Sequence, residues 1–261
     1  MGNTALENQI KRQSNRRMLE LLEISKRFDG VFAIKDVSFS ISLGSITGLI
    51  GPNGAGKTTL FNVITGFLNP ENGTVNFQNR PLTGLSPFKI ALSGIGRTFQ
   101  NLRIIKGLSV EENILLALSE GRVIRSIIKA FERRDSKVEE EKVKELLEVV
   151  GLSDKRYDLA GDLSYGQQKL LTIACCLALE PRLLLLDEPV AGIAPEMIEK
   201  ILGIIKELPS KGKSVIMIEH NLDAIMQVCD RVIFMDAGKK ICEGTPEEVR
   251  NDPRVIEAYI D

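Results

Sequence analysis

The chain has 261 residues, enough to bury a sizeable core as one large α/β domain or as a domain with an inserted lobe. Its formal net charge of -1 excludes a protein that seeks polyanions with its whole surface, although it leaves room for a local basic patch. No apolar run approaches the ~20 residues that span a bilayer, so we expect any membrane role to come through a partner. Residues 1–17 are polar and lack the apolar core of a secretory signal, which predicts an N-terminal tail without a function of its own.

Strands are predicted for the first part of the chain. Alternating apolar residues indicate strands at 19–24 and 37–41, and the apolar run 45–50 indicates a third. The dipeptide Asn72-Gly73 is typical of turns, and it predicts an edge strand over 74–77 that begins there.

The middle of the chain, from 102 to 162, has the pattern of helices. Ser109 and Glu112 are spaced as a capping box, and Val143, Leu147 and Val150 are among the apolar residues that repeat at helical spacing. We interpret this region as a mostly helical insertion.

An α/β alternation resumes after the helical insertion. The apolar runs 183–186, 215–218 and 232–235 are separated by segments with helical patterns that follow Pro195 and Asn221. Near-continuous apolar strands separated by helices favour a largely parallel sheet that is covered on both faces.

The four cysteines have no metal-ligand spacing and lie inside apolar runs, which favours buried, reduced thiols and a cytosolic compartment. They are Cys175, Cys176, Cys229 and Cys242.

The segment 51–58 has the sequence GPNGAGKT, which fits the phosphate-binding pattern G-x-x-x-x-G-K-[ST]. Its glycines let successive backbone N–H groups face one point, and a helix that begins near Lys57 adds its positive dipole end. Lys57 would reach the β- and γ-phosphates, and the Thr58 hydroxyl would bind Mg²⁺. A chain of this length matches the pattern by accident about once in a hundred, so the context of the segment decides its meaning.

Asp187 and Glu188 directly follow the apolar run 183–186. An aspartate at the end of such a strand can serve Mg²⁺, and the adjacent glutamate can polarise a water against the γ-phosphate. The alternative is that both residues merely end a strand, but the phosphate-binding segment favours the functional interpretation.

Two further polar residues end predicted strands. His220, the only histidine, follows the run 215–218 and is expected at the same sheet edge as Glu188, where it could contact the γ-phosphate or hold the attacking water. Gln100 ends the run 95–99, where its amide could touch Mg²⁺ or water.

The segment Leu163–Gln167 comes directly before a long apolar helix. The Ser164 hydroxyl and the Gly166 backbone would lie at the helix N-terminus, which is a second anion site. Two phosphate-binding surfaces in one chain suggest that ATP is sandwiched between two subunits.

Together, these segments resemble the nucleotide-binding subunits of ATP-binding cassette (ABC) transporters, whose order and spacing they match from about Met18 onward. The resemblance implies a P-loop NTPase cassette fold: α/β, with a mostly parallel core sheet, an antiparallel β subdomain and an inserted helical subdomain. It also implies a single ABC ATPase domain over 18–261, with a catalytic core at 18–101 and 163–261 and the helical subdomain at 102–162.

The resemblance also implies roles for individual residues. The implied contacts to ATP are Phe28, which would stack on adenine, and Asn53, Gly54, Ala55, Gly56, Lys57, Thr58 and Thr59. Contacts to the ATP of a partner subunit are implied for Ser164, Gly166 and Gln167. Mg²⁺ would be served by Thr58, Gln100 and Asp187, and the catalytic residues would be Glu188, His220 and Gln100.

Two residues depart from the family pattern. Tyr165 replaces the commonest glycine of its motif, a change that the flanking Ser164 and Gly166 make tolerable. Ala194 stands where many relatives carry an aspartate that links the two sites across the dimer, which puts the strength of that communication in question.

Within the family, the segments 94–103, 163–168, 188–192 and 252–259 look like those of branched-chain amino-acid importers. Urea and amide importers and the lipopolysaccharide-export ATPase share much of this pattern. The implied partners are permease subunits, a second cassette (this chain or a sister) and, indirectly, an external solute-binding protein. The implied place is the cytoplasmic face of the membrane.

Two alternatives come from other functional classes. A soluble cassette that acts on nucleic acid or ribosomes usually has two cassettes in one chain or a long coiled-coil insertion, neither of which is visible, so no nucleic acid is expected. A GTPase or small-molecule kinase would share only the segment 51–58, and the chain has no Asn-Lys-x-Asp motif for guanine.

Overall fold

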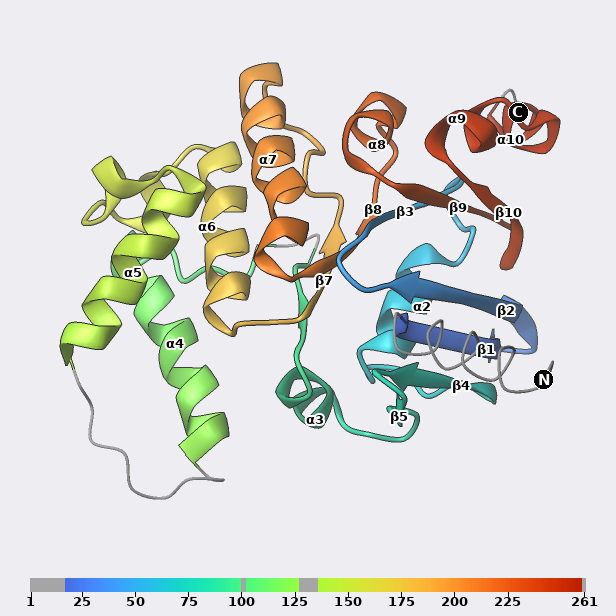
Figure 1. Cartoon of the computed structure of the whole chain (residues 1–261), viewed down its shortest axis with the longest axis horizontal. Helices are drawn as coiled ribbons and strands as arrows, with labels where there is room; N and C mark the ends of the chain where they lie inside the picture. The colour runs from blue at the N-terminus through green and yellow to red at the C-terminus, as the bar shows by residue number, and fades with distance from the viewer. Residues whose placement is uncertain (1–16, 100–101, 127–135, 260–261) are drawn as a thin grey trace, which may run out of the picture.

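A computed structural model describes residues 17–99, 102–126 and 136–259 (Figure 1). It contains two sheets, with helices on both faces of the larger one and the smaller one at one side of the molecule. Among the described residues, no helix combines the length and the apolar character that a membrane span requires.

The larger sheet has six strands in the order β10-β9-β3-β8-β7-β6. All its neighbouring strands pair in parallel except β10, which is antiparallel to β9. Every residue of β3, β7 and β8 is buried, as expected for strands covered on both faces. The strands are β3 (Ile46–Ile50), β6 (Ile95–Arg97), β7 (Leu183–Asp187), β8 (Ser214–Ile218), β9 (Arg231–Asp236) and β10 (Lys239–Gly244). The predicted, mostly parallel core sheet is confirmed.

The smaller sheet is antiparallel and has the order β2-β1-β4-β5. Its strands are β1 (Arg17–Phe28), β2 (Val31–Ser42), β4 (Asn72–Phe77) and β5 (Arg80–Pro81). The predicted turn at Asn72-Gly73 is wrong, because both residues lie inside β4, and β4 pairs on both sides instead of forming an edge. The turn is Gln78-Asn79, whose φ angles of 48° and 61° are those of a type I′ hairpin.

Helices cover both faces of the larger sheet (Figure 1). They are α2 (Lys57–Ile64), α3 (Pro87–Leu92), α4 (Val110–Ser126), α5 (Ser136–Val150), α6 (Tyr165–Ala178), α7 (Pro195–Glu207), α8 (Leu222–Val228), α9 (Pro246–Arg250) and α10 (Pro253–Ala258). Short 3₁₀ turns occur at Ser153–Lys155, Ala160–Asp162 and Pro209–Lys211.

The larger sheet separates two hydrophobic cores. Along β7, Leu184 and Leu186 face one core, which they share with α4 to α8, whereas Leu183 and Leu185 face the other. The second core also contains α2 and the inward face of the antiparallel sheet. This alternation follows from the period of two along a strand, and it fixes α2 on one side of β7 and α6 on the other.

Several helix ends follow the sequence signals. Ser109 and Glu112 form the expected reciprocal capping box at α4, and Thr245 and Glu248 form another at α9. The cysteines are free thiols, of which Cys176 and Cys229 are buried and the other two are partly exposed.

Helix α7 begins without a side-chain cap. Ala194 occupies the N-cap with φ −68° and ψ 150°, an extended backbone that suits an aspartate cap. We expect Ala194→Asp to raise the free energy of unfolding by about 1 kcal/mol, because its carboxylate can accept a hydrogen bond from the first turn. Urea denaturation measures this change. Ser164→Ala, which removes the existing cap of α6, should shift stability in the opposite direction. A less stable Ala194→Asp protein would contradict the expectation.

Candidate functional site

The phosphate-binding segment connects β3 to α2 and depends on its glycines. Gly51, Gly54 and Gly56 have φ angles of 147°, 81° and 94°. A Cβ atom at Gly51 would lie 1.9 Å from the Met235 carbonyl oxygen, and one at Gly56 would lie 2.4 Å from that of Ala33. The loop can therefore approach its neighbours this closely only with glycine at both positions.

Lys57 begins α2 and lies across the loop. Its Nζ atom donates to the carbonyl oxygens of Gly51, at 2.7 Å, and Pro52, at 2.9 Å. Burial lowers the pKa of Lys57, and the charges of Glu188 and Asp187 act in the opposite direction. Lys57 is thus close enough to Glu188 and Asp187 for both carboxylates to stabilise its positive charge.

The other residues of the loop differ in exposure. Asn53, Gly54 and Thr58 are exposed, Ala55 is buried and Thr59 is half-buried. The Thr58 hydroxyl is therefore accessible beside the N-terminus of α2, where the helix dipole favours an anion.

Glu188 directly follows β7 in an unusual backbone conformation. Its φ angle of 51° is in the left-handed region, which costs a non-glycine residue about 1–2 kcal/mol. Two hydrogen bonds hold it there: Glu188 N–H donates to the Ile218 carbonyl oxygen at 3.0 Å, and Lys169 Nζ donates to the Glu188 carbonyl oxygen at 2.6 Å. These contacts fix the backbone from which the Glu188 side chain projects.

His220 lies beside Glu188, as the parallel pairing of β7 with β8 requires. Its Nε2 atom is 3.4 Å from Glu188 Oε1. The histidine side chain is 40% exposed and that of the glutamate 21%, so the pair faces solvent at the carboxyl edge of the sheet. This geometry agrees with the expectation that His220 and Glu188 lie at the same edge of the sheet.

Lys169 and Glu219 support this pair, and the sequence analysis did not identify them. Glu219 is 2% exposed, and its carboxylate accepts hydrogen bonds from Val190 N–H at 2.8 Å and His220 N–H at 3.3 Å. Burial raises the pKa of Glu219, and the charge of Lys169 opposes that rise. The sequence did offer one signal for Glu219, because it lies directly between the apolar run 215–218 and the only histidine.

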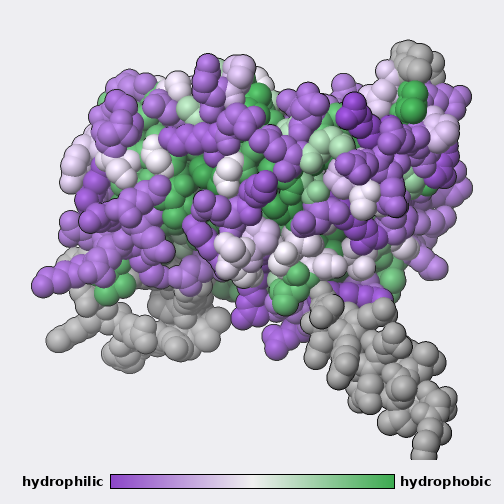
Figure 2. All heavy atoms as spheres, turned by 45° about the horizontal axis from the view of Figure 1, so that its top comes forward, coloured by the Kyte–Doolittle hydropathy of each residue, from purple (hydrophilic) through white to green (hydrophobic). Residues whose placement is uncertain are grey.

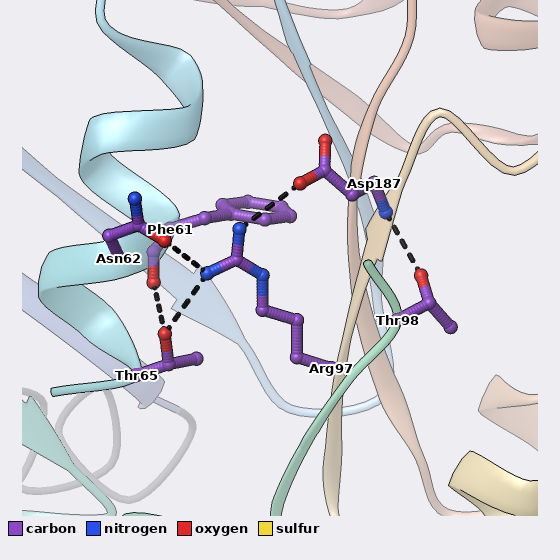
Figure 3. Close-up of polar contacts among 6 residues, drawn as sticks. All are labelled: Phe61, Asn62, Thr65, Arg97, Thr98 and Asp187. Atoms are coloured by element: carbon purple, nitrogen blue, oxygen red, sulfur yellow. Dashed lines mark hydrogen bonds and ion pairs between the residues drawn. The ribbon is translucent and has the colours of Figure 1, made fainter. Parts of the chain in front are cut away.

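Asp187, the last residue of β7, is held by Arg97 and Thr98 (Figure 3). Its Oδ2 atom is 3.1 Å from Arg97 Nη2, and its backbone N–H donates to Thr98 Oγ1 at 3.1 Å. Burial raises the pKa of Asp187, whereas the hydrogen bond and charge of Arg97 lower it. Arg97 is a third residue that the sequence analysis missed.

The residues expected to contact a partner's nucleotide lie at the N-terminus of α6. Ser164 and Gln167 form a capping box, and Gly166 is buried so closely against Met197 that an added Cβ would lie 2.5 Å from its side chain. In Figure 1, β7 lies between this helix and α2. The structure therefore does not gather Ser164, Gly166 and Gln167 around the loop of their own chain.

Phe28 ends β1 and is 45% exposed. The hairpin that follows it approaches the loop, because Ala33 on β2 is the residue whose carbonyl meets Gly56. An exposed ring at this end of the hairpin is compatible with stacking on a base. Gln100 lies outside the described residues.

These groups fit a nucleoside triphosphate with Mg²⁺. The glycine loop, Lys57 and the N-terminus of α2 supply donors and positive charge for phosphates, and Thr58 and Asp187 supply the oxygen ligands that Mg²⁺ prefers. Among the described residues, no cluster of three or more histidine, cysteine or acidic side chains offers an independent metal site.

Comparisons with known proteins agree with this site. A family model described as ABC transporter matches residues 34–191, and one described as branched-chain amino acid ATP-binding cassette transporter matches residues 239–260. The chain is 36% identical to the high-affinity branched-chain amino acid transport ATP-binding protein BraF of Pseudomonas aeruginosa, over 94% of this chain and 98% of that protein. It is 39% identical to a probable branched-chain amino acid transport ATP-binding protein LivG of Methanocaldococcus jannaschii, over 93% and 97%.

Solved structures are similar as well. An ATP-binding cassette of an ABC transporter in its ADP conformation superposes with a TM-score of 0.83 and 36% identity, over 94% of this chain and 98% of that one. A dimeric cassette in a post-hydrolysis state, bound to ADP and Pi, gives a TM-score of 0.76 and 26% identity, over 88% and 99%.

The two glycines Gly54 and Gly56 provide a matched test of the loop. Both have positive φ, but an added Cβ at Gly54 meets no atom within 4 Å, whereas one at Gly56 meets the Ala33 carbonyl oxygen. We expect Gly56→Ala to lower the free energy of unfolding by about 1–3 kcal/mol more than Gly54→Ala does, because only the former overpacks the structure. Urea denaturation of both variants measures the difference. Equal stabilities would refute the close contact.

Proposed function

Because the chain belongs to the ABC transporter family of ATP-binding cassettes, we propose that it binds and hydrolyses Mg-ATP to energise a membrane permease for branched-chain amino acids. One observation carries the enzymatic part: Lys57, Asp187, Glu188 and His220 converge at the carboxyl edge of the parallel sheet. A nucleotide-binding role for such an edge follows from the loop geometry and the helix dipole at α2.

The binding steps use the loop and its neighbours. Backbone N–H groups of residues 53–59 and Lys57 Nζ bind the phosphates, and Lys57 exchanges its contacts with Gly51 and Pro52 for phosphate oxygens. Phe28 stacks on the adenine. Thr58, Asp187 and Gln100 would hold Mg²⁺ directly or through water, and the bound ion would neutralise charge on the phosphates.

The hydrolytic step uses Glu188 and His220. The Glu188 carboxylate orients the attacking water and polarises it, and His220, 3.4 Å away, limits where that carboxylate can point. The hydrogen bonds of Glu188 to Ile218 and Lys169 hold its backbone in the left-handed conformation, which fixes the point at the sheet edge from which the carboxylate projects.

A second cassette completes the site. Ser164, Gly166 and Gln167 lie across β7 from the loop of their own chain, so they serve the nucleotide bound by a partner cassette (Figure 1). The dimeric relative bound to ADP and Pi supports this arrangement. The partner is a sister chain or a second copy, and Ala194 at the start of α7 lacks the carboxylate that would link the two sites.

The transported solute is inferred from the relatives. Those with high coverage act in branched-chain amino acid transport, and the segment 239–260 matches a family model of that transport class. We further propose one cassette domain over 18–261, with its catalytic core at 18–101 and 163–261 and a helical subdomain at 102–162 that contacts the permease at the cytoplasmic face of the membrane. An external solute-binding protein would deliver the amino acid to that permease.

The surface agrees with a peripheral subunit. Figure 2 shows a face on which hydrophilic side chains predominate, with hydrophobic side chains lying between them. Such a face suits a protein that reaches the membrane through its partners.

Replacement of Glu188 tests the hydrolytic role. We expect Glu188→Gln to bind ATP normally but to lose about 10²-fold or more in turnover, because the amide cannot polarise the water. ATP hydrolysis and equilibrium binding of a fluorescent ATP analogue are measured together. Glu148→Gln, which changes an exposed residue of α5, should leave both unchanged. Turnover near wild type for Glu188→Gln would remove Glu188 from the mechanism.

Reconstitution tests the transport role. We expect the cassette to co-purify with membrane permease subunits and to drive ATP-dependent uptake of branched-chain amino acids into vesicles. Glu188→Gln complexes should assemble but not transport. Uptake of urea or amides instead, export of lipopolysaccharide, or association with ribosomes or nucleic acid would each reject the proposed solute in favour of the corresponding alternative.

A further inference from the structure

Arg97 is a buried cation that joins three elements near the proposed nucleotide site (Figure 3). It ends β6, its Nη1 atom donates to Asn62 Oδ1 at 2.7 Å and Thr65 Oγ1 at 3.2 Å, and its Nη2 atom donates to Asp187 Oδ2 at 3.1 Å. The side chains of Arg97 and Asp187 are only 6% and 5% exposed. At this burial the pair is only weakly screened by solvent, and loss of either partner would leave an uncompensated charge.

The partners of Arg97 belong to the two halves of the proposed site. Asn62 lies on α2 and Thr65 caps its C-terminus, and α2 is the helix that begins with Lys57. Asp187 ends the strand that precedes Glu188. One guanidinium therefore connects the helix of the phosphate loop with the strand that carries the expected Mg²⁺ carboxylate.

The surroundings of Arg97 suit a guanidinium specifically. Its Cζ atom lies 5.5 Å from the centroid of the Phe61 ring and 4.9 Å from that of the Phe99 ring. One terminal nitrogen of its planar guanidinium donates to side chains of α2 and its C-cap, and the other donates to Asp187. The single ammonium group of a lysine cannot make this pair of contacts.

The contact also sets the orientation of the carboxylate. Oδ2 of Asp187 accepts the hydrogen bond from Arg97, and in Figure 3 the other carboxylate oxygen points away from the guanidinium. Fixing one oxygen of a carboxylate fixes the direction of the other, which is how outer-shell hydrogen bonds orient groups that serve a metal.

We propose that Arg97 is a positioning residue that orients the Asp187 carboxylate relative to α2 and thereby sets the preference of the site for Mg²⁺-bound over metal-free nucleotide. The inference rests on the proposed function, since it presupposes that a nucleotide with Mg²⁺ binds at the loop. In this role Arg97 acts through Asp187, and it is not expected to contact the nucleotide or the reacting atoms.

Nucleotide binding with and without Mg²⁺ tests this role. The Kd of the fluorescent ATP analogue is measured for wild type and Arg97→Met, once in excess Mg²⁺ and once in EDTA, alongside the Tm of each protein. We expect the advantage that Mg²⁺ gives to binding to fall about 10-fold in the variant, a typical effect of losing an outer-shell partner. The Kd in EDTA should stay near the wild-type value.

Three other variants sharpen the test. Arg103→Met is the matched control, because it removes a guanidinium 3.5 Å from the centroid of the same Phe99 ring but leaves the contact to Asp187 intact, and its Mg²⁺ advantage should match wild type. Asn62→Ala removes one of the two α2-side acceptors of the guanidinium and should reduce the advantage by less than Arg97→Met does. If Arg97→Met does not fold, Arg97→Lys keeps the charge without the fork and should still show a reduced advantage.

The outcomes separate the possible roles of Arg97. An equal loss of affinity in Mg²⁺ and in EDTA would mean that Arg97 only supports the fold, and a larger Mg²⁺ advantage would mean that it competes with the ion for Asp187. Either result overturns the proposal. Failure of the proposed function would look different, since wild type itself would then bind no nucleotide or gain nothing from Mg²⁺.

Discussion

Parallel pairing of β3 with β8, and of β8 with β7, is the constraint on which the site depends. Parallel strands place their carboxyl ends at the same edge, so the loop after Ile50, the carboxylates after Leu186 and the histidine after Ile218 meet although they are far apart in sequence. Because these strands are buried on both faces, none can shift without moving leucine and isoleucine side chains between two cores. The geometry of the site is therefore determined by the packing of apolar residues that take no part in its chemistry.

Local signals in the sequence were sufficient for much of this arrangement. The strands, the glycine loop and the capping boxes each depend on neighbouring residues, so a short segment predicts them. The turn at Gln78-Asn79 was missed because the pair lacks the glycine that marks a two-residue hairpin turn most strongly, whereas Asn72-Gly73 has that composition but is held in β4 by its pairing with β1. Tertiary pairing overrode local preference at that point.

The supporting residues could not be predicted in the same way. Arg97, Lys169 and Glu219 are ordinary charged residues in the sequence, and their importance comes from burial and from partners on other elements. A charge in a dry interior must be matched, so each forms hydrogen bonds that orient a neighbour. Arg97 acts on Asp187, whereas Lys169 and Glu219 act on the backbones of Glu188 and His220. The candidate site thus has two layers, and the motifs identify only the residues expected to contact the nucleotide and Mg²⁺, not the residues that support them.

The cap at the start of α6 has a consequence for the proposed contact of that helix with a nucleotide bound by a partner cassette. Ser164 Oγ accepts from the Gln167 N–H at 3.3 Å, and the Gln167 side chain in turn accepts from the Ser164 N–H. A hydroxyl has two lone pairs and one proton, and the cap uses only a lone pair. The proton of the serine can therefore rotate toward an incoming phosphate oxygen while the helix stays capped. The Ser164 hydroxyl would then cap the helix through a lone pair and bind an anion through its proton, so the helix would not lose its cap when the anion binds.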